Sequence, residues 1–241
     1  MANREFILLQ KTVEPLLREL LADSEFQALP RTFAYPNSVL KESILFLGIN
    51  TSISNEKHEE IESYELLQNE NGHPNFRKFQ EIAEYCIRPW SHFDLLFFRE
   101  TDQSRINELL KTDVGLDFLW KQLLVSDKII RETNAEIIVV NNTLARRFLG
   151  LDRIGNNNVW LNYEFVFDNE IGTYRWQGIP VFFSGMLTGQ HALDRGSFER
   201  LKWHIRNTLI FDLEKKKKEV VVFKNEVVKS TKYELAAEFR D

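Results

Sequence analysis

At residues 44–50 the sequence reads Ile44-Leu45-Phe46-Leu47-Gly48-Ile49-Asn50, and this stretch decides the fold. A short, uninterrupted apolar run that ends at a glycine is typical of a parallel β-strand buried on both faces. Small and polar residues follow at once, in the segment Thr51–Ser54. The stretch therefore predicts a central strand with a polar loop at its carboxyl end.

Apolar strands and helical patterns alternate outward from this stretch, from about residue 40 to about residue 210. Further strands are predicted at 137–140 and 181–183, with a hairpin at 159–167 and 174–176. Helical spacing separates them at 76–86, 116–132, 143–149 and 198–209. Such alternation predicts a three-layer α/β/α sandwich with a short, mainly parallel central sheet.

We expect one α/β domain over residues 1–213, with its core at about 40–210 and a helical extension at 1–39, in which Pro15 predicts either a kink or two short helices. Residues 54–72 are polar and acidic and predict a long loop. Four consecutive lysines at 215–218 mark a change of composition. The apolar stretches after them predict a small β-hairpin at 220–235, within a C-terminal appendage that spans 214–241.

Composition excludes several classes of protein. The single cysteine, Cys86, excludes an intramolecular disulfide framework and a multi-cysteine metal site. The five histidines lack metal-binding spacing. No apolar run approaches the roughly 18 residues of a membrane span, and the first residues are too acidic for a secretory signal. We expect a cytoplasmic monomer that needs no metal, membrane or organic cofactor.

The net charge of −5 argues at first against a nucleic-acid partner, because phosphate binding needs a surplus of basic residues. Its location changes that interpretation. Residues 54–84 hold eight acidic and three basic residues, which is 3 − 8 = −5, so the rest of the chain sums to zero. The acidity is local, and DNA remains a possible partner.

Three loops leave the carboxyl ends of predicted strands: 48–54, 141–142 and 184–196. In open α/β sheets ligands bind beyond these ends. Each loop is rich in small or amide residues, which are also ordinary turn residues. None has the glycine pattern of a nucleotide-binding loop or the setting of a nucleophilic serine. The three together indicate a ligand site at one edge of the sheet.

The motifs around these loops resemble the uracil-DNA glycosylase superfamily. The segment 44–54 is similar to the first active-site motif of its mismatch-specific uracil/thymine branch, in which an apolar strand runs into Gly-Ile-Asn-Pro-Gly-Leu-Ser. The segment 73–79 is similar to the His-Pro-x-Asn-Arg-Phe-Trp that follows there, and 136–149 and 179–201 resemble later strand-turn-helix regions. The chain departs from the family at Thr51-Ser52, at Asn71 and in the second motif, 184–191.

This resemblance implies a hydrolase that flips uracil or a related damaged or mismatched base out of DNA and cleaves its N-glycosidic bond. Asn50 would position the water, and His191 would be the second-motif histidine. Base contacts are expected from Gly48, Ile49, Thr51, Ser52, Phe76, Asn141, Asn142 and Ser184. DNA contacts are expected from Met186, Leu187 and Arg195.

Two other functions fit the same residues. The altered second motif favours a catalytically silent module that binds a nucleobase or nucleic acid. Alternatively, the acidic segment 54–72 and the predicted hairpin are docking surfaces of a protein-interaction module. For Leu187 and Met186 the alternative to a DNA contact is a place in the core, and for Arg195 it is a solvated helix face.

Overall fold

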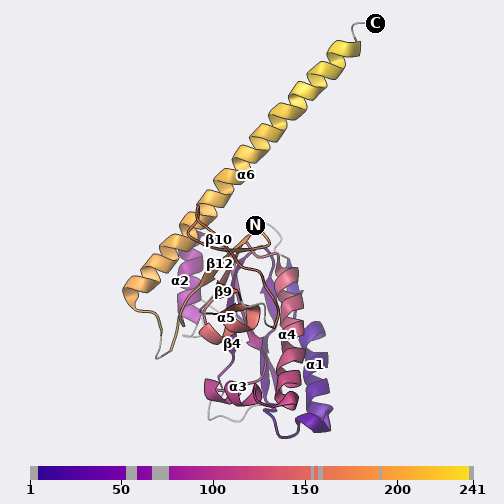
Figure 1. Cartoon of the computed structure of the whole chain (residues 1–241), viewed down its shortest axis with the longest axis vertical. Coiled ribbons are helices and arrows are strands. Elements are labelled where there is room, and N and C mark those ends of the chain that lie inside the picture. Colours follow the sequence, from indigo (N-terminus) through magenta and orange to yellow (C-terminus); the bar gives the residue numbers. More distant parts are fainter. Residues whose placement is uncertain are drawn as a thin grey trace.

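The computed structural model describes residues 5–52, 59–66, 76–152, 155–156, 160–189 and 192–238. Over these ranges the chain is a mixed α/β protein with six α-helices and a central sheet of six strands (Figure 1). The strand order is β10-β11-β12-β7-β4-β6. Four neighbours run parallel: β12 (Ile179–Phe183), β7 (Ile137–Val140), β4 (Ile44–Asn50) and β6 (Trp90–Leu96).

The other two strands make the sheet mixed. β11 (Thr173–Trp176) pairs antiparallel with β12, and β10 (Val166–Asp168) pairs antiparallel with β11 at the edge. The predicted central strand is therefore confirmed, and so are the strands that became β7 and β12. The predicted hairpin is present in shorter form as β10 and β11.

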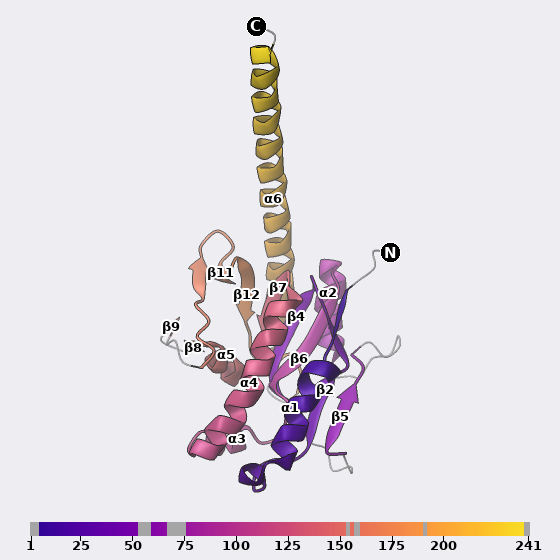
Figure 2. The ribbon, with the colours of Figure 1, turned by 90° about the vertical axis from the view of Figure 1, so that its right-hand side faces the viewer.

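Alternate residues of β4 enter two different apolar clusters, because successive side chains of a strand point to opposite faces. Leu45 and Leu47 pack in one cluster with α1 (Gln10–Ala22), α4 (Asp113–Thr133) and α5 (Thr143–Leu149). Ile44 and Phe46 pack in the other with α2 (Arg77–Cys86) and α6 (Arg195–Glu238). Figure 2 shows α1 and α4 together on one side of the sheet.

The N-terminal region is more than the helical extension predicted for residues 1–39. β1 (Phe6–Leu8) pairs with β3 (Ser38–Leu40), and β2 (Phe33–Pro36) pairs with β5 (Ile61–Tyr64). A short 3₁₀ helix (Ser24–Phe26) follows α1, and α1 itself is one helix that contains Pro15. β5 also places a strand inside the predicted loop 54–72. These short strands depend on pairing with distant partners, which local patterns do not reveal.

The remaining elements are α3 (Gln103–Leu109) and the strand pair β8 (Leu151–Asp152) and β9 (Gly155–Asn156). α3 begins at Asp102, whose side chain accepts a hydrogen bond from the Ser104 amide. α5 ends at Gly150, whose φ of 115° is readily adopted only by glycine. Aspartate before the first turn of a helix and glycine after its last turn are the residue types that mark helix ends in a sequence.

The predicted C-terminal hairpin is wrong, because α6 continues through this region to Glu238 and projects from the body of the protein (Figure 1). The valines suggested strands, but no glycine or proline follows Gly196, so no turn interrupts the helix. Lysine and glutamate are also good helix formers. The domain boundary expected at residue 213 therefore lies inside a continuous helix.

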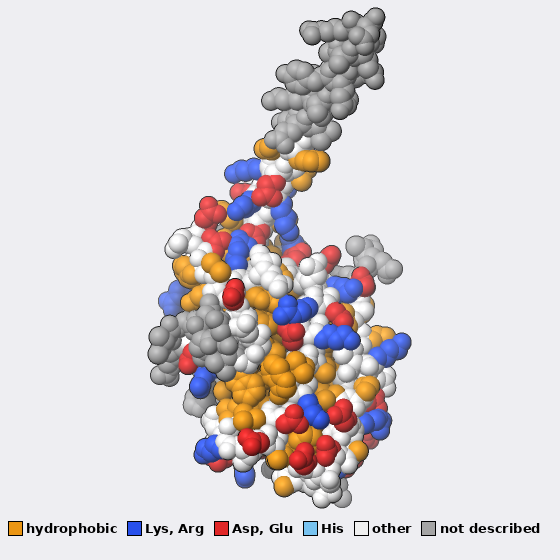
Figure 3. Space-filling model, turned by 45° about the vertical axis from the view of Figure 1, so that its right-hand side comes forward, with side chains coloured by type: hydrophobic (Ala, Val, Ile, Leu, Met, Phe, Trp, Pro, Cys, Tyr) orange, Lys and Arg blue, Asp and Glu red, His pale blue; other side chains and the backbone are white. Residues whose placement is uncertain are grey.

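Four apolar side chains lie exposed on the projecting part of α6. Each residue of Val220–Phe223 has between 56% and 68% of its surface accessible. Figure 3 shows them as the last apolar side chains described along the helix, beyond a basic segment. No helix in the described ranges is both long and apolar enough to span a membrane.

Candidate functional site

Backbone hydrogen bonds join the carboxyl ends of the parallel strands. The Asn141 amide donates to the Leu47 carbonyl at 3.0 Å, and the Ser184 amide donates to the Val140 carbonyl at 2.9 Å. On the other side, the Glu100 amide after β6 donates to the Thr51 carbonyl at 3.0 Å. The three predicted loops therefore begin at one edge of the sheet, as expected.

The strand order reverses between β4 and β7. The chain passes from β4 to β6 on one side, and then returns to β7 on the other side of β4. The helix after β4 is α2, and the helix after β7 is α5; they pack in the two different apolar clusters. Connections that leave neighbouring strands toward opposite faces open a crevice between them, where α/β proteins bind their ligands.

Two polar side chains of β6, the neighbour of β4 on the side away from β7, lie next to Gly48, and neither was among the predicted site residues. His92 is paired with Phe46 of β4, and Asp94 is paired with Gly48. Both point to the face covered by α2, because Trp90 on the same side packs there. Both residues belong to an apolar stretch of sequence, which favoured interpreting the whole stretch as core. The feature that could have indicated a site is the spacing of a histidine and an aspartate two residues apart, which places them on one face of a strand.

Asp94 explains the glycine at position 48. A Cβ atom at Gly48 would lie 2.0 Å from Asp94 Oδ1 and 3.3 Å from His92 Nε2. The first distance is far below any van der Waals contact. The carboxylate thus occupies the space in which a side chain of residue 48 would stand, and the motif needs glycine there for close approach rather than for a special backbone angle.

Burial controls the protonation of this pair. Only 12% of the Asp94 side chain is exposed, and burial raises the pKa of its carboxyl group, against the opposing effects of His92 and Thr51. Burial likewise lowers the pKa of His92. His92 Nε2 lies 3.7 Å from Asp94 Oδ1, beyond hydrogen-bond distance. The pair therefore holds a neutral imidazole beside a carboxyl group that is more basic than usual.

A chain of hydroxyl groups leads to the carboxylate. Thr51 Oγ1 donates to Asp94 Oδ2 at 3.0 Å, and the Tyr64 hydroxyl hydrogen-bonds with Thr51. Burial and the charge of Asp94 raise the pKa of Tyr64, so the phenol stays protonated. One carboxylate oxygen of Asp94 is thus held by Thr51, and Oδ1 remains above Gly48.

Aromatic rings enclose His92. Its ring centre lies 5.5 Å from that of Phe76 and 5.1 Å from that of Phe79. Phe76 also stacks on Tyr64, at 6.3 Å and an interplanar angle of 18°. Within the described residues His92 Nδ1 is buried and has no hydrogen-bond partner. Phe76 is therefore part of the aromatic wall behind His92.

Asn50 is half-buried at the end of β4, and its side-chain amide group is held in place. Nδ2 donates to the Glu100 carbonyl at 2.6 Å and, more weakly, to the Thr51 carbonyl at 3.3 Å. Because both of its contacts with described residues use the donor atom, the acceptor, Oδ1, is left for a ligand or a water. This geometry is compatible with the predicted role in positioning water.

The two neighbouring asparagines after β7 have different roles. Asn142 is the N-cap of α5, since its Oδ1 accepts from the amides of Leu144 and Ala145 at 2.8 and 3.2 Å. Asn141 is 9% exposed, and its Oδ1 has no hydrogen-bond partner in the part of the chain that the structure describes. An unpaired buried acceptor is costly, which points to a ligand that donates to it.

We predict that Asn142→Ala lowers the free energy of unfolding by about 1 kcal/mol, the usual cost of losing an asparagine N-cap. Urea unfolding would measure the difference, with Asn169→Ala in an exposed turn as the matched control. A loss of ligand binding without any loss of stability would instead assign Asn142 to the site.

The other predicted site residues are spread around this cluster. Ser184 is half-buried, and its hydroxyl donates to the Gly185 carbonyl at 2.9 Å. Ser52 and Arg195 are exposed, and Met186 is half-buried. Ile49 is buried in the core, which leaves its backbone as the part that a ligand could reach. His191 lies outside the described residues.

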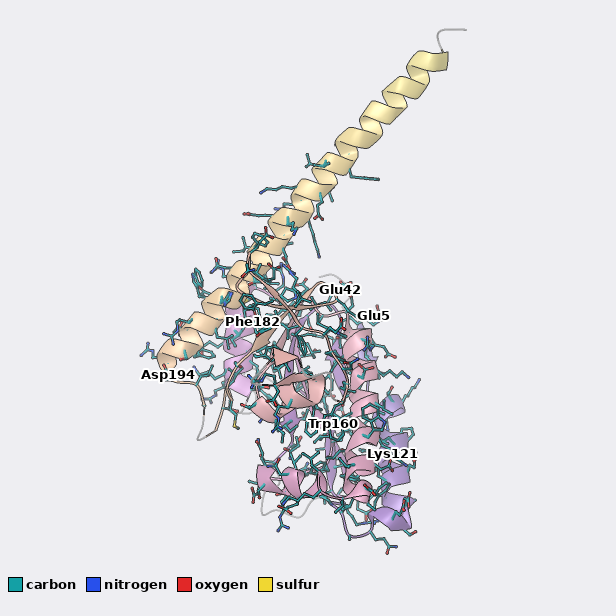
Figure 4. All side chains as sticks on the ribbon, in the orientation of Figure 1. Glu5, Glu42, Lys121, Trp160, Phe182 and Asp194 are labelled. Carbon is teal, nitrogen blue, oxygen red and sulfur yellow. The ribbon has the colours of Figure 1, made fainter. Side chains whose placement is uncertain are left out.

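Leu187 corrects one expectation, because it is buried in the core and does not face a partner. It is 3% exposed and packs in the same cluster as Phe182 and α6. Figure 4 marks Phe182 on β12 and Asp194 just before α6, on either side of this loop. Apolar contact within the fold accounts for Leu187, so Met186 remains the candidate for a DNA contact.

A groove of about 780 Å³ lies elsewhere, along β10 and β11. Its charged lining includes Arg131 and Arg175, and both pair with aspartates of the same chain. The groove therefore offers neither a free cation nor the polar side chains described above. No group of three or more metal-binding side chains occurs among the residues that the structure describes.

Comparisons of the chain with protein-family models, with curated proteins and with solved structures find no match.

Proposed function

We propose that this protein is an N-glycosyl hydrolase of the DNA glycosylase type, which removes uracil or a related damaged or mismatched base. One observation carries the proposal: at the reversal of strand order, β4 ends at the fixed Asn50 amide, β7 is followed by the unpaired Asn141 Oδ1, and the Asp94 carboxyl group of β6 covers Gly48. In this proposal, the helices that cover the two faces of the sheet are the outer layers of a three-layer α/β/α sandwich.

The reaction needs three things from this site. Water must be oriented toward C1′ of the sugar, which the fixed Asn50 amide can do through Oδ1. The departing base carries negative charge, and backbone N–H groups after Gly48 would stabilise it. A ring N–H, which uracil has at N3 and cytosine lacks, would be recognised by the unpaired Asn141 Oδ1.

DNA would approach over the Ser184 loop and the start of α6. Arg195 and Arg200 are exposed there, and exposed arginines on a helix are suited to phosphate contacts. Lys202 is less available, because it pairs with Glu81 and Glu199. Phosphate binding at this surface predicts affinity for DNA that falls as salt is raised.

We predict that Asn50→Ala lowers base release by about 100-fold, the usual effect of losing a group that orients a reactant. The assay measures free base from oligonucleotides that contain uracil, or G·U or G·T mismatches, with Asn169→Ala as the control. If the wild-type protein releases no base from a broad panel of damaged substrates, the proposed activity is wrong.

A silent base-binding module is the second candidate. It is favoured by Leu187, which is buried in the core at the place where the resemblance implies a residue inserted into DNA. The two functions separate cleanly: the module would bind abasic or uracil-containing DNA without turnover. DNA binding by such a module would still depend on Asn141. If DNA bound at an unrelated surface instead, Asn141→Ala would leave the affinity unchanged.

A further inference from the structure

We propose that Asp94 is the catalytic base of this site and takes a proton from the water that attacks C1′. The inference rests on the proposed hydrolase function. It places the catalytic base on β6, outside the loop motifs that contain the other predicted site residues.

Geometry brings the Asp94 carboxylate to the first motif. Asp94 lies directly across from Gly48 in the parallel register, and its Oδ1 stands over the Gly48 backbone. Thr51, which directly follows Asn50 at the end of β4, reaches back to the same carboxylate with its hydroxyl group. The carboxylate is therefore tied to both ends of the segment that carries the residue that would orient the water.

The two carboxylate oxygens have different surroundings. Oδ2 accepts the hydroxyl of Thr51 at 3.0 Å, which fixes the rotation of the carboxylate. Oδ1 is 3.7 Å from His92 Nε2 and thus makes no hydrogen bond with it. A fixed carboxylate with one oxygen left for a water is the arrangement that general base catalysis requires.

The neighbouring groups are poorer bases. The Asn50 amide cannot accept a proton at neutral pH. Burial lowers the pKa of His92, and its ring lies 5.1 Å from that of Phe79 of α2, with Nδ1 buried and unpaired within the described residues. Burial raises the pKa of Asp94, which makes its ionised carboxylate a stronger base than an exposed one.

The step balances without a cofactor. As the C1′–N bond breaks, its electron pair leaves with the base, and the sugar develops oxocarbenium character. The water oxygen forms the new C1′–O bond, and one of its protons passes to Asp94. The base anion then takes up a proton from solvent, and Asp94 releases its proton to solvent, which restores the site.

The test is the pH dependence of single-turnover base release by the full chain. Wild-type activity should fall as pH drops through the pKa of Asp94, because the base must be ionised. Asp94→Asn should lower the rate by about 10²–10⁴-fold, the range of general base catalysis, and remove that acid limb. Asp117→Asn, at an exposed position of α4, is the matched control and should behave as wild type.

Thr51 supplies an independent variant. Thr51→Val removes the hydroxyl that favours the ionised carboxylate, so the acid limb should move to higher pH. Thr51→Ser keeps the hydroxyl and should leave the limb in place. A purely structural role for Asp94 would not produce this paired result. Melting curves for each variant establish that it is folded.

The outcomes separate the two claims. If wild-type protein releases no base, the proposed function fails. If wild-type protein is active and folded Asp94→Asn keeps both its rate and its acid limb, the assignment of Asp94 is overturned while the hydrolase function stands. An unmoved limb in Thr51→Val would also contradict the assignment.

Discussion

Gly48→Ala is expected to lower the free energy of unfolding by about 1–3 kcal/mol and to reduce base release by about 100-fold. The added methyl group would stand 2.0 Å from Asp94 Oδ1, so the carboxylate must turn away or the two strands must separate. Rotation of the carboxylate would break its hydrogen bond with Thr51. Stability and catalysis should therefore be lost together, which urea unfolding and a base-release assay would show.

Two further variants make this prediction specific. Gly196→Ala adds a methyl group in the exposed first turn of α6, 3.2 Å from Asp194 Oδ1, and should cost much less stability than Gly48→Ala. In an Asp94→Ala background, Gly48→Ala should cost much less stability than in the wild type, because the colliding carboxylate is gone. Equal costs in both backgrounds would contradict the close approach of Gly48 and Asp94.

Asp94→Asn should be more stable than the wild type at neutral pH, by about 1 kcal/mol, although its base release is expected to be about 10²–10⁴-fold slower. The folded protein raises the pKa of Asp94 above its ordinary value near 3.8. Between the ordinary pKa and the raised pKa of the folded protein, Asp94 is protonated in the folded state and ionised in the unfolded state. The free energy of unfolding of the wild type therefore declines as pH rises through that interval. Asparagine cannot ionise, so the variant escapes this loss.

The pH dependence of the difference provides the check. The stability gained by Asp94→Asn should be small in acid, grow as pH rises above about 4, and level off above the pKa of folded Asp94. His92 acts in the opposite sense: its lowered pKa removes stability as pH falls below about 6.5, in both proteins. A variant less stable than wild type at every pH would show that Asp94 is a structural residue.

Much of the fold followed from local patterns. The apolar runs that became β4 and β7 are buried on both faces, and the periodicity at 116–132 became α4. The loops after the strands converge because parallel strands end at one edge of a sheet. What local patterns could not supply was the pairing of short strands such as β5, which depends on residues far apart in the chain.

Two errors of interpretation have clear physical origins. The apolar residues at 220–223 favour a strand locally, but the helix formers before them and the lack of a turn residue after Gly196 keep α6 continuous. His92 and Asp94 were passed over because they alternate with apolar residues facing the opposite cluster. The role of a polar residue buried on one face of a strand can be inferred only when the residue paired with it on the neighbouring strand is known.

The central claim is that the edge of the sheet at Gly48, Asn50 and Asp94 hydrolyses N-glycosidic bonds. Its most direct test measures the free uracil released from a uracil-containing oligonucleotide in a single turnover at neutral pH, by the wild type and by Asp94→Asn. We predict complete release by the wild type and a rate at least about 100-fold lower for the folded variant. Equal release by both proteins, or none by the wild type, would contradict it.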